Sequence, residues 1–366
     1  MKLLLLATVP GELLTLKSEF IKTALKKNYQ VIASSSALHS ESSIDIANLK
    51  FTYDPIYLKR HGFSVIGNFK TILSIIKLYK KHNPQYILAS GIKLVIWGGI
   101  SSRIVNAPFY AHITGLGYAF QDITFLRRLL KKVVSILYKV ALKNSQAVIF
   151  ENIDNRDLFV SQGIIPMSKS FIINGSGVDL QKYSFTKIPD TDISFLMISR
   201  LLGEKGIREY AAAAKLVKQK FPDVQFQLVG SQDASLDAIP LEEVLSWSEY
   251  INYEGFVKDI RSSIKNCHVF VLPSYHEGLP RCTIEAMSMG RPILTTNAVG
   301  CKETVEEDIN GFMVSIGSSS ELAKKMIWFI ENPNKISSMG KNSRAIAEQR
   351  FDIHKINSEI FKILNI

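Results

Sequence analysis

Apolar runs of strand length alternate with longer stretches of helical periodicity along almost the whole chain, and this alternation limits the possible folds more than any other feature. The pattern occurs twice, on either side of a polar linker at 183–192. Strands that alternate with helices pair in parallel and lie between helical layers. We therefore expect an α/β protein of two facing, doubly wound domains. Ligands of such folds bind outside the carboxyl ends of the strands, so the expected ligand site is an interdomain cleft.

We predict the first domain at 1–180 and the second at 181–350. In the first domain, strands are predicted at 2–9, 30–34, 85–89, 109–113, 147–151 and 170–173, and helices at 13–27 and 69–82. In the second, strands are predicted at 193–199, 225–229, 250–253, 269–272 and 292–296, and helices at 207–221, 257–265 and 320–331. A long last helix, 335–364, is interrupted near Phe351, and we expect its end, 351–366, to pack back on the first domain.

The composition is that of a globular protein in a reducing, cytoplasmic compartment. Hydrophobic residues make up 46% of the 366 positions. The three cysteines (Cys267, Cys282 and Cys301) have the spacing of neither a disulfide framework nor a zinc site. The apolar run at 3–9 precedes Pro10-Gly11-Glu12 rather than a small-residue cleavage pattern, so we interpret it as a first strand and not a signal peptide. No apolar stretch reaches about 18 residues, so no transmembrane helix is expected.

The positive charge is confined to the first half of the chain. Residues 1–180 hold 22 Lys and Arg against 10 Asp and Glu, whereas residues 181–366 hold 22 against 23. The net charge of +11 therefore comes entirely from the first half. Such segregation indicates an anionic partner, which could be a membrane surface, a phosphorylated substrate or a nucleic acid.

A strand, loop and helix at 269–292 carry two carboxylates near a potential anion site. The apolar strand 269–272 leads through Pro273 into a loop that contains Glu277, and a helix beginning near Thr283 carries Glu285. The unpaired amides and the dipole at a helix start favour phosphate, and carboxylates accept hydrogen bonds from sugar hydroxyls. The alternative is an ordinary strand–loop–helix unit with surface acids.

Arg200 and Lys205 leave the carboxyl end of the second domain's first strand, beside Gly203 and Gly206. An arginine fork and a lysine point charge at this edge can neutralise a diphosphate. Two ordinary surface cations are the alternative.

These motifs together resemble glycosyltransferase family 4. The resemblance rests on Arg200, Lys205-Gly206, Pro273-Ser274, Glu277-Gly278-Leu279-Pro280, Glu285-Ala286-Met287, Gly290-Arg291-Pro292, Gly300, Glu303 and Asn310-Gly311-Phe312. In the first domain, the segments at 112–117, 148–152 and 175–179 are similar to the capsule- and glycan-building branch of that family. This branch includes an N-acetylgalactosaminyltransferase that acts on an undecaprenyl-diphosphate-linked acceptor. Residues 35–70 match no motif.

The resemblance implies two Rossmann-like domains of the GT-B type, a UDP-sugar donor, and retention of anomeric configuration with neither a metal nor a cofactor. By this analogy Arg200 and Lys205 hold the donor diphosphate, Glu277 binds hydroxyls of the transferred sugar, and Glu285 binds the ribose. The implied catalytic residues are His112, Arg200, Lys205 and Glu277. His112 ends a first-domain strand, and in the family a histidine here approaches the donor sugar and the acceptor.

Further donor-binding candidates lie at turns and loop ends. Gly11, after the first strand, allows the donor close to the backbone. The remaining candidates are Gly230, Phe256, Val257, Gly278, Leu279 and Thr283. Asp190-Thr191-Asp192 has the spelling of a metal-binding Asp-x-Asp motif, but it precedes an apolar run instead of ending one, so we interpret it as linker and predict no metal.

Two basic helices in the first half are candidates for a membrane surface. One carries Arg127, Arg128, Lys131, Lys132, Lys139 and Lys143 on one face, and Leu126, Leu129, Leu130, Val133, Leu137, Val140 and Ala141 on the other. The second runs from Lys70 to Lys81. Each helix separately also fits an apolar side packed on the sheet and a solvated basic side. We expect the protein to lie peripherally on the inner face of the plasma membrane.

The leading hypothesis is therefore a retaining glycosyltransferase that moves a sugar, N-acetylgalactosamine as our guess, from a UDP-sugar to a lipid-linked glycan. One alternative is a nucleotide-sugar epimerase of the same architecture, which needs no acceptor. Another is a nucleic-acid-binding protein, but the basic residues lack interleaved aromatic platforms, so no nucleic acid is expected as a partner.

Overall fold

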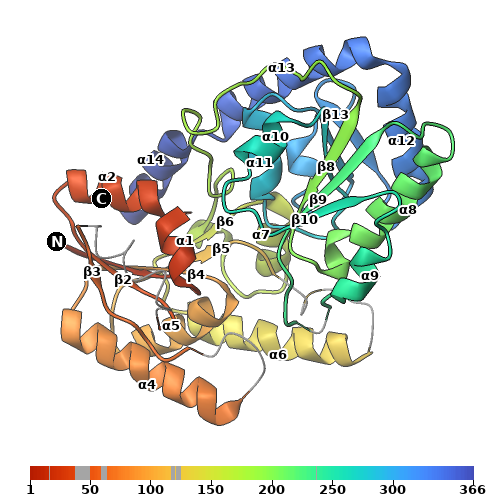
Figure 1. Cartoon of the computed structure of the whole chain (residues 1–366). Helices are drawn as coiled ribbons and strands as arrows, with labels where there is room; N and C mark the ends of the chain where they lie inside the picture. The colour runs from red at the N-terminus through yellow and green to blue at the C-terminus, as the bar shows by residue number, and fades with distance from the viewer. Residues whose placement is uncertain (16, 38–49, 59–63, 117–119, 121–124, 236) are drawn as a thin grey trace. The chain divides into compact units, whose positions relative to one another are not determined.

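The structure is a computed structural model that describes residues 1–15, 17–37, 50–58, 64–116, 120, 125–235 and 237–366, with the backbone alone at 125–127. It divides into two compact units. Unit 1 comprises Met1–Ser176 and His354–Ile366, and unit 2 comprises Gly177–Ile353. Each unit contains one parallel sheet with helices on its faces (Figure 1). The prediction of an α/β protein with two Rossmann-like domains is confirmed.

Unit 1 is built on a parallel sheet in the order β3-β2-β1-β4-β5-β6-β7. Its strands are β1 (Lys2–Leu6), β2 (Gln30–Ser34), β3 (Thr52–Tyr53), β4 (Tyr86–Ser90), β5 (Phe109–Ile113), β6 (Ala147–Phe150) and β7 (Ser170–Ile172). Its helices are α1 (Pro10–Thr15), α2 (Ser18–Lys26), α4 (Val65–His82), α5 (Ile92–Val105), α6 (Phe125–Leu142), α7 (Ile153–Ser161) and α14 (Ile353–Leu364).

Both faces of the unit 1 sheet are buried, because successive side chains of each strand point to opposite faces. Leu4 and Leu6 of β1 belong to a core with residues of α4, α5, α6 and α7. Leu3 and Leu5 belong to a second core with residues of α1, α2 and α14. In Figure 1, α4, α5 and α6 lie side by side along one face of this sheet.

Unit 2 is built on a parallel sheet in the order β10-β9-β8-β11-β12-β13. Its strands are β8 (Ser194–Ile198), β9 (Gln225–Val229), β10 (Asn252–Gly255), β11 (Val269–Leu272), β12 (Ile293–Thr296) and β13 (Gly311–Val314). Its helices are α8 (Ile207–Lys218), α9 (Leu241–Leu245), α10 (Arg261–Lys265), α11 (Arg281–Ser288), α12 (Ser319–Glu331) and α13 (Pro333–Arg350), and a short 3-10 helix, η3 (Gly203–Lys205), precedes α8.

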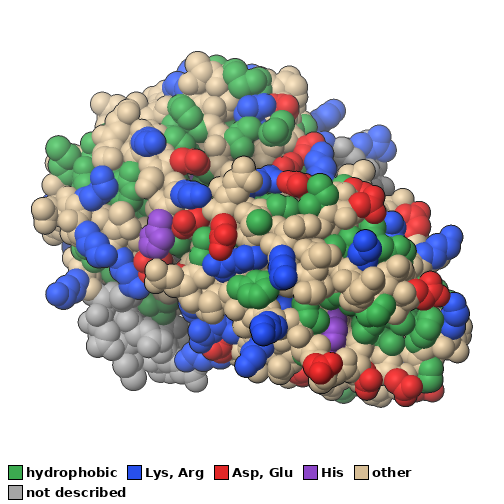
Figure 2. All heavy atoms as spheres, turned by 90° about the horizontal axis from the view of Figure 1, so that it is seen from above, with side chains coloured by type: hydrophobic (Ala, Val, Ile, Leu, Met, Phe, Trp, Pro, Cys, Tyr) green, Lys and Arg blue, Asp and Glu red, His purple; other side chains and the backbone are tan. Residues whose placement is uncertain are grey.

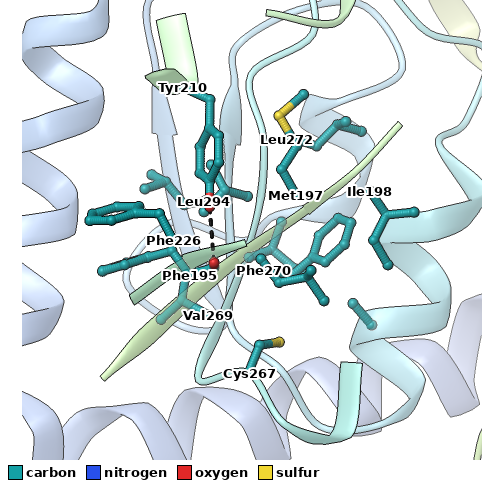
Figure 3. Close-up of a cluster of buried hydrophobic side chains, with 14 of the residues drawn as sticks. Phe195, Met197, Ile198, Tyr210, Phe226, Cys267, Val269, Phe270, Leu272 and Leu294 are labelled. Atoms are coloured by element: carbon teal, nitrogen blue, oxygen red, sulfur yellow. Dashed lines mark hydrogen bonds between the residues drawn. The ribbon is translucent and has the colours of Figure 1, made fainter. Parts of the chain in front are cut away.

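The core of unit 2 explains why strands β8 and β11 are nearly continuous apolar runs in the sequence. All residues of β8 and β11 are buried, so neither strand alternates between apolar and polar side chains. Phe195 of β8 stacks on Phe226 of β9, with ring centroids 5.3 Å apart. The buried hydroxyl of Tyr210 donates to the carbonyl of Phe195 at 2.9 Å, which fixes α8 on the sheet (Figure 3).

Several predicted elements need correction. The single helix predicted at 13–27 is two helices, α1 and α2, because the chain bends near Lys17, whose side chain turns inward and is buried. The helix predicted at 257–265 is shorter in the structure, where α10 covers only Arg261–Lys265. Helix α4 begins at Val65 instead of 69, because Ser64 caps it by accepting a hydrogen bond from the amide of Gly67. Helices α5 and α7 were not predicted.

Among the described residues, no helix is both long and apolar enough to cross a bilayer. The last two helices, α13 and α14, meet near Phe351, where the sequence predicts an interruption. Helix α14 packs on unit 1, and its Phe361 stacks on Phe20 of α2 with ring centroids 4.7 Å apart.

Candidate functional site

The unit 2 sheet grows in opposite directions from its central pair, β8 and β11, with β9 and β10 on one side and β12 and β13 on the other. Ligands of doubly wound sheets bind at such a point, outside the carboxyl ends of the strands. The segment after β8 carries Arg200 and Lys205, and the loop after β11 carries Glu277. The fold therefore brings the two predicted diphosphate-binding cations and the predicted sugar-binding carboxylate to one edge of one sheet.

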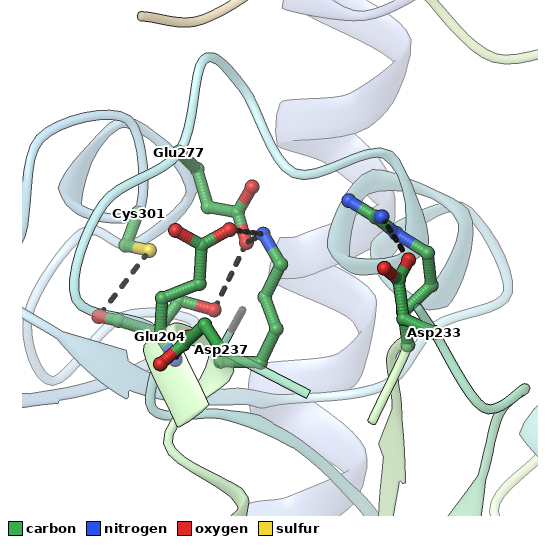
Figure 4. Close-up of polar contacts among 8 residues, drawn as sticks. Glu204, Asp233, Asp237, Glu277 and Cys301 are labelled. Atoms are coloured by element: carbon green, nitrogen blue, oxygen red, sulfur yellow. Dashed lines mark hydrogen bonds and ion pairs between the residues drawn. The ribbon is translucent and has the colours of Figure 1, made fainter. Parts of the chain in front are cut away.

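Lys205 and Glu277 form the centre of this edge. The Nζ atom of Lys205 donates to Oε1 of Glu277 at 2.6 Å, and the hydroxyl of Ser274 donates to the same oxygen at 2.9 Å (Figure 4). Oε1 of Glu204 lies 4.0 Å from the same Nζ. Burial by itself lowers the pKa of Lys205, but Glu277 and Glu204 outweigh it and raise the pKa above its ordinary value. Lys205 is therefore a fixed cation at neutral pH.

Arg200 is paired with a carboxylate that the sequence analysis did not single out. Its Nη1 atom donates to Oδ2 of Asp233 at 2.5 Å (Figure 4). The Asp233 carboxylate is 5% exposed, whereas the Arg200 side chain is 46% exposed. Burial raises the pKa of Asp233, but the Arg200 guanidinium and the hydrogen bonds from Ser235 hold it below its ordinary value. Asp233 thus anchors one end of a guanidinium that is otherwise open to solvent.

Close backbone contacts fix the loops that carry these groups. Gly206 adopts a left-handed conformation (φ 73°), and a Cβ there would lie 2.1 Å from the carbonyl oxygen of Pro273. Gly300 also adopts a left-handed conformation and packs closely on the Glu277 loop. A Cβ at Gly300 would lie 2.3 Å from the carbonyl oxygen of Gly278. The Asp237 carboxylate accepts a hydrogen bond from the amide of Glu204 at 2.6 Å. The position of Lys205 is therefore set by the backbone on both sides.

Helix α11 follows the Glu277 loop and carries the second predicted carboxylate. Glu285 is buried and accepts a hydrogen bond from Nε of Arg281 at 2.8 Å, one helical turn earlier. Burial, together with the neighbouring Glu285, raises the pKa of Tyr183 well above its ordinary value. Thr283 is fully buried, and its hydroxyl has no hydrogen-bond partner in the structure. A ribose that binds Glu285 would have to share its carboxylate with Arg281 or displace the Arg281 side chain.

The other donor-binding candidates of unit 2 border the same sheet edge in different ways. Gly230 packs tightly, since a Cβ there would lie 1.6 Å from the carbonyl oxygen of Ser199. Phe256 is 73% exposed just after β10, and Val257 packs partly on the core. Gly278 and Leu279 follow Glu277, and the Leu279 side chain is buried in the core. Gly230 is required for packing, while Phe256 presents an open aromatic face.

In unit 1 the two predicted donor-site residues differ sharply in burial. Gly11 lies in α1 with open space beside it, because a Cβ there would meet no atom within 4 Å. His112, near the end of β5, is fully buried. Its Nδ1 atom lies 3.1 Å from Nζ of Lys17, and its Nε2 atom lies 3.2 Å from Oε1 of Glu151 without hydrogen-bond alignment. Gly117, part of the motif that follows His112, lies outside the described residues.

Helix α6 exposes part of its predicted apolar face. Leu129, Val133 and Val140, predicted on the apolar side of a helix that could lie on a membrane or pack on the sheet, are exposed, together with Ile136. The helix instead packs through Val134, Tyr138, Ala141 and Leu142, a stripe offset by about one position. Four exposed basic residues flank the exposed apolar ones: Arg128, Lys132, Lys139 and Lys143. Lys131 is partly buried, and the side chains of Leu126 and Arg127 lie outside the described part of the chain.

Helix α4 repeats this combination on its solvent side. Val65, Ile66, Phe69 and Leu73 are exposed, with exposed fractions from 42% to 87%. Lys70, Lys77 and Lys80 are exposed on the same helix. On the face of the molecule drawn in Figure 2, by contrast, basic and acidic side chains are interspersed. The two helices therefore present apolar and basic groups together.

Asp190 and Asp192 are exposed in an irregular segment ahead of β8. In the part of the chain that the structure describes, no group of three or more His, Cys, Asp or Glu side chains could hold a metal ion.

Sequence reasoning missed five side chains that complete these sites: Lys17, Glu151, Asp233, Asp237 and Arg281. Two weak signals were present. Asp233 and Asp237 follow the predicted strand end at 229, and Arg281 stands four residues before Glu285, a spacing that allows an ion pair on a helix. Lys17 gave no signal, because it lies 95 residues before its partner His112.

Two doubly wound units, one with paired cations and carboxylates at its ligand-binding edge, fit the class of glycosyltransferases with two Rossmann-like domains. The family model for glycosyl transferase 4-like domains matches residues 2–152, and that for glycosyl transferases group 1 matches residues 181–346. The chain belongs to these glycosyltransferases and is an enzyme of this class. The resemblance to family 4 is confirmed, and the assignment favours the leading hypothesis over the epimerase and the nucleic-acid-binding alternatives.

Two characterised relatives match most of the chain. It is similar to the N,N'-diacetylbacillosaminyl-diphospho-undecaprenol alpha-1,3-N-acetylgalactosaminyltransferase of Campylobacter jejuni, with 28% identity over 301 residues, 78% of each chain. It is also similar to the UDP-Gal:alpha-D-GlcNAc-diphosphoundecaprenol alpha-1,3-galactosyltransferase of Escherichia coli, with 26% identity over 309 residues, 80% of this chain and 78% of the relative.

Solved structures share the fold at lower identity. Sucrose-phosphate synthase from Thermosynechococcus elongatus superposes with a TM-score of 0.82 at 16% identity, over 100% of this chain and 98% of the other. HepE of Anabaena, in complex with UDP and glucose, superposes with a TM-score of 0.79 at 23% identity, over 100% and 99%. These matches establish the GT-B fold.

Proposed function

We propose that the enzyme transfers N-acetylgalactosamine from a UDP-sugar to a polyprenyl-diphosphate-linked glycan, with retention of anomeric configuration and without a metal ion. The product would serve bacterial surface polysaccharide or protein-glycan synthesis. The acceptor class is supported by the two relatives, whose names both specify diphosphoundecaprenol-linked acceptors. The sugar is supported by the Campylobacter relative alone.

The observation that carries the proposal is the Lys205–Glu277 contact beside Arg200 at the reversal point of the unit 2 sheet. In the reaction the bond between the sugar C1 and the diphosphate oxygen breaks, and negative charge builds on the departing diphosphate. Fixed cations aimed at that charge stabilise the transition state more than the ground state. Lys205 and Arg200 supply them, and each exchanges its carboxylate partner for a phosphate oxygen when the donor binds.

Glu277 is then released to accept hydrogen bonds from hydroxyls of the transferred sugar. Retention requires the acceptor oxygen to bond C1 on the face from which the diphosphate leaves. A departing phosphate oxygen on that face takes the proton of the acceptor hydroxyl, so no separate protein base is needed. Glu285 binds the ribose hydroxyls and Phe256 stacks on the base, since it is an exposed aromatic at the end of β10.

The exposed faces of α4 and α6 suit the surface of an anionic membrane, where a polyprenyl-linked acceptor resides. Val133 and Ile136 of α6 and Phe69 of α4 would enter the interface, and Arg128, Lys132 and Lys139 would contact lipid phosphates. Each basic residue contributes about 1 kcal/mol near an anionic surface. We therefore place the enzyme peripherally on the inner face of the plasma membrane.

Catalysis is tested by a screen of UDP-sugars for UDP release with an undecaprenyl-diphosphate-linked saccharide. UDP-N-acetylgalactosamine is expected to give UDP release that depends on acceptor, and a product that retains the donor's anomeric configuration. Lys205→Ala and Glu277→Ala should lower transfer by at least about 100-fold, as removal of a charge-stabilising group does in other active sites. Lys220→Ala, which removes an exposed lysine of unit 2, is the matched control.

Wild-type rates in both Lys205→Ala and Glu277→Ala would refute this site. Conversion of the donor to an isomeric UDP-sugar without acceptor would identify an epimerase instead. Activity that requires a divalent cation and disappears with chelator would refute the metal-independent mechanism.

Membrane association is tested by sedimentation with vesicles of phosphatidylglycerol and phosphatidylcholine. Ile136→Asp should weaken binding about 10-fold or more, because burial of such a side chain is worth about 1.5–3 kcal/mol. Leu216→Asp, which changes an apolar residue of α8 that is 44% exposed, should leave binding unchanged. Equal binding of wild type and Ile136→Asp would exclude α6 as the contact.

A further inference from the structure

Three buried, titratable side chains meet at the carboxyl ends of β5 and β6 in unit 1. His112 stands on β5, Glu151 directly follows β6, and Lys17 lies between α1 and α2. Their exposed fractions are 0%, 5% and 6%. Lysine and glutamate are almost never buried to this degree without partners, so the cluster needs an explanation beyond packing.

The contacts within the cluster specify the protonation state of His112. A lysine ammonium group only donates hydrogen bonds, so the Nδ1 atom 3.1 Å from Lys17 Nζ must be the acceptor and carries no proton. The proton of the neutral ring therefore sits on Nε2. That atom lies 3.2 Å from Oε1 of Glu151, a carboxylate oxygen that can only accept. The Nδ1 contact thus selects the tautomer, and the charge of Glu151 favours a proton on Nε2 although the pair lacks hydrogen-bond alignment.

Hydrogen bonds fix the two carboxylates near the ring, Glu151 and Glu12. The hydroxyl of Ser176 donates to the same Oε1 of Glu151 at 3.0 Å. Glu12 of α1 accepts hydrogen bonds from the amide of Thr8 at 3.0 Å and from the hydroxyl of Ser90 at 2.7 Å. Among the described residues, the charged groups that act on the imidazole are one cation, Lys17, and two carboxylates, Glu12 and Glu151.

We propose that Lys17 is a positioning residue that holds His112 as the neutral Nε2–H tautomer. The competing state, an imidazolium, would place a second donor at Nδ1 directly against the ammonium group of Lys17. That state requires Lys17 to move or to lose its own proton. The histidine consequently keeps one orientation and one charge across the range in which a free imidazole titrates.

The electrostatics of the cluster agree with this geometry. Burial and then Lys17 lower the pKa of His112, while Glu151 and Glu12 act in the opposite direction. Burial likewise lowers the pKa of Lys17, and Glu12 and Glu151 oppose that change. The two carboxylates therefore favour a protonated Lys17, which in turn disfavours a protonated His112.

The consequence for catalysis rests on the proposed function, in which His112 borders the donor sugar. A neutral, fixed imidazole adds no charge to that site, so transfer should show no ionisation attributable to His112 near its ordinary pKa of about 6.5. Loss of Lys17 would introduce an ionisation of His112 into the pH dependence of transfer.

The tautomer is tested directly by long-range proton–nitrogen correlation spectra of the histidine rings in the full-length, ¹⁵N-labelled protein. The His112 signals are identified by their absence in His112→Gln. In the wild type we expect a protonated Nε2 and an unprotonated Nδ1, unchanged between about pH 5 and 8, the range of histidine titration. Wild-type His112 that titrates in this range, or that carries its proton on Nδ1, overturns the proposal without any use of the catalytic assay.

Variants of Lys17 separate positioning from packing. Lys17→Met keeps the length of the side chain but removes the donor, and should allow His112 to exchange between tautomers or to titrate. Lys17→Arg retains a donor and should restore the wild-type ring spectrum. Lys22→Met changes an exposed lysine of α2, the helix that follows Lys17, and should leave the His112 signals unchanged. Identical ring spectra in Lys17→Met and wild type would refute the role, and the wild-type spectrum remains decisive if Lys17→Met does not fold.

The pH profile of kcat/KM supplies the catalytic readout. Lys17→Met should acquire an acidic limb, because Glu151 and Glu12 then favour a protonated His112 without opposition from Lys17, and Lys17→Arg should not. If the ring spectra change as expected but the profile of Lys17→Met does not, Lys17 positions His112 and the placement of His112 at the donor sugar is wrong. Failure of the positioning role of Lys17 and failure of the placement of His112 at the donor sugar therefore give different results.

Discussion

The cations at the ligand-binding edge of unit 2 are each neutralised by a carboxylate of the same unit, Lys205 by Glu277 and Arg200 by Asp233. Buried or partly buried charges need such partners, because an unpaired charge loses its hydration without compensation. The same pairing means that donor binding is an exchange of partners and not a simple addition. The groups that compete with the diphosphate for these cations are therefore the carboxylates of Glu277 and Asp233.

Substitutions of Lys205 and Glu277 should move UDP affinity in different directions. Lys205→Met removes a charged hydrogen bond to phosphate, worth about 1.5–3 kcal/mol, and should weaken UDP binding about 10- to 100-fold. Glu277→Gln removes the competing carboxylate and should leave UDP affinity unchanged or raise it, while transfer falls. Isothermal titration with UDP measures both, with Lys220→Met as the control. UDP binding weakened as much in Glu277→Gln as in Lys205→Met would place Glu277 on the nucleotide and not on the sugar.

Asp233 should stabilise unit 2 only where it is ionised. Its pKa is held below the ordinary value, so its contribution is present above the pKa of the unfolded chain, about 3.9, and is lost as the pH falls through the lower folded value. Asp233→Asn should therefore cost about 1 kcal/mol at neutral pH, a small figure because Arg200 is half exposed. Urea unfolding at about pH 7 and pH 3 measures this, with exposed Asp190→Asn as the control. A cost that persists undiminished at the lower pH would show that the carboxylate's charge is not its source.

At the scale of whole elements, the sequence predicts what depends on local pattern and misses what depends on packing. The strands at 30–34, 109–113, 225–229 and 269–272 were located by short runs rich in apolar residues. Helix α5 was not predicted, because it packs against α4, α6 and the sheet. Its sequence therefore lacks a polar stripe and a helical period of hydrophobic residues. The sequence left open which side of α6 packs on the sheet, because that helix has two apolar stripes and only packing decides which one is buried.

The same division applies to the candidate site. Arg200, Lys205 and Glu277 could be predicted because each follows a strand end, where a parallel sheet binds ligands. Their carboxylate and backbone partners could not, since the Asp233 and Gly300 contacts depend on how loops from different strands fold against one another.

The approach of α5 to α6 should make Gly99 intolerant of any side chain. A Cβ there would lie 2.6 Å from the carbonyl oxygen of Ala141, a backbone atom that cannot move without shifting α6. Gly99→Ala should therefore cost about 1–3 kcal/mol, the cost of an overpacked contact, although alanine ordinarily stabilises a helix. Gly11→Ala in α1 meets only open space and should leave stability unchanged or raise it by up to about 1 kcal/mol. Thermal unfolding compares the two, and a Gly99→Ala variant as stable as wild type would show that the two helices can separate freely.

At the scale of the whole molecule, the chain enters unit 2 at Gly177 and returns to unit 1 at His354, so unit 1 is completed by residues that follow the whole of unit 2 in the sequence. Helix α14 covers the second face of the unit 1 sheet, where Ile356, Ile360 and Leu364 are buried among residues of β1 and α2. Unit 2, by contrast, is continuous in sequence and has its own core. The stability of unit 1 should therefore depend on the far end of the chain, and that of unit 2 should not.

Phe361→Ala tests this dependence. Phe361 is 3% exposed and stacks on Phe20, so its removal should destabilise unit 1 by about 3–5 kcal/mol, as expected for loss of a buried phenylalanine. Hydrogen exchange followed by mass spectrometry should show lower protection in peptides of β1, β2 and α2, while peptides of β8 and β11 keep wild-type protection. Phe171→Ala changes a phenylalanine of β7 that is 38% exposed, and should leave both units unchanged. If β8 and β11 lost protection to the same extent as β1, the two units would unfold as one, and unit 2 would owe its stability to the end of the chain as well.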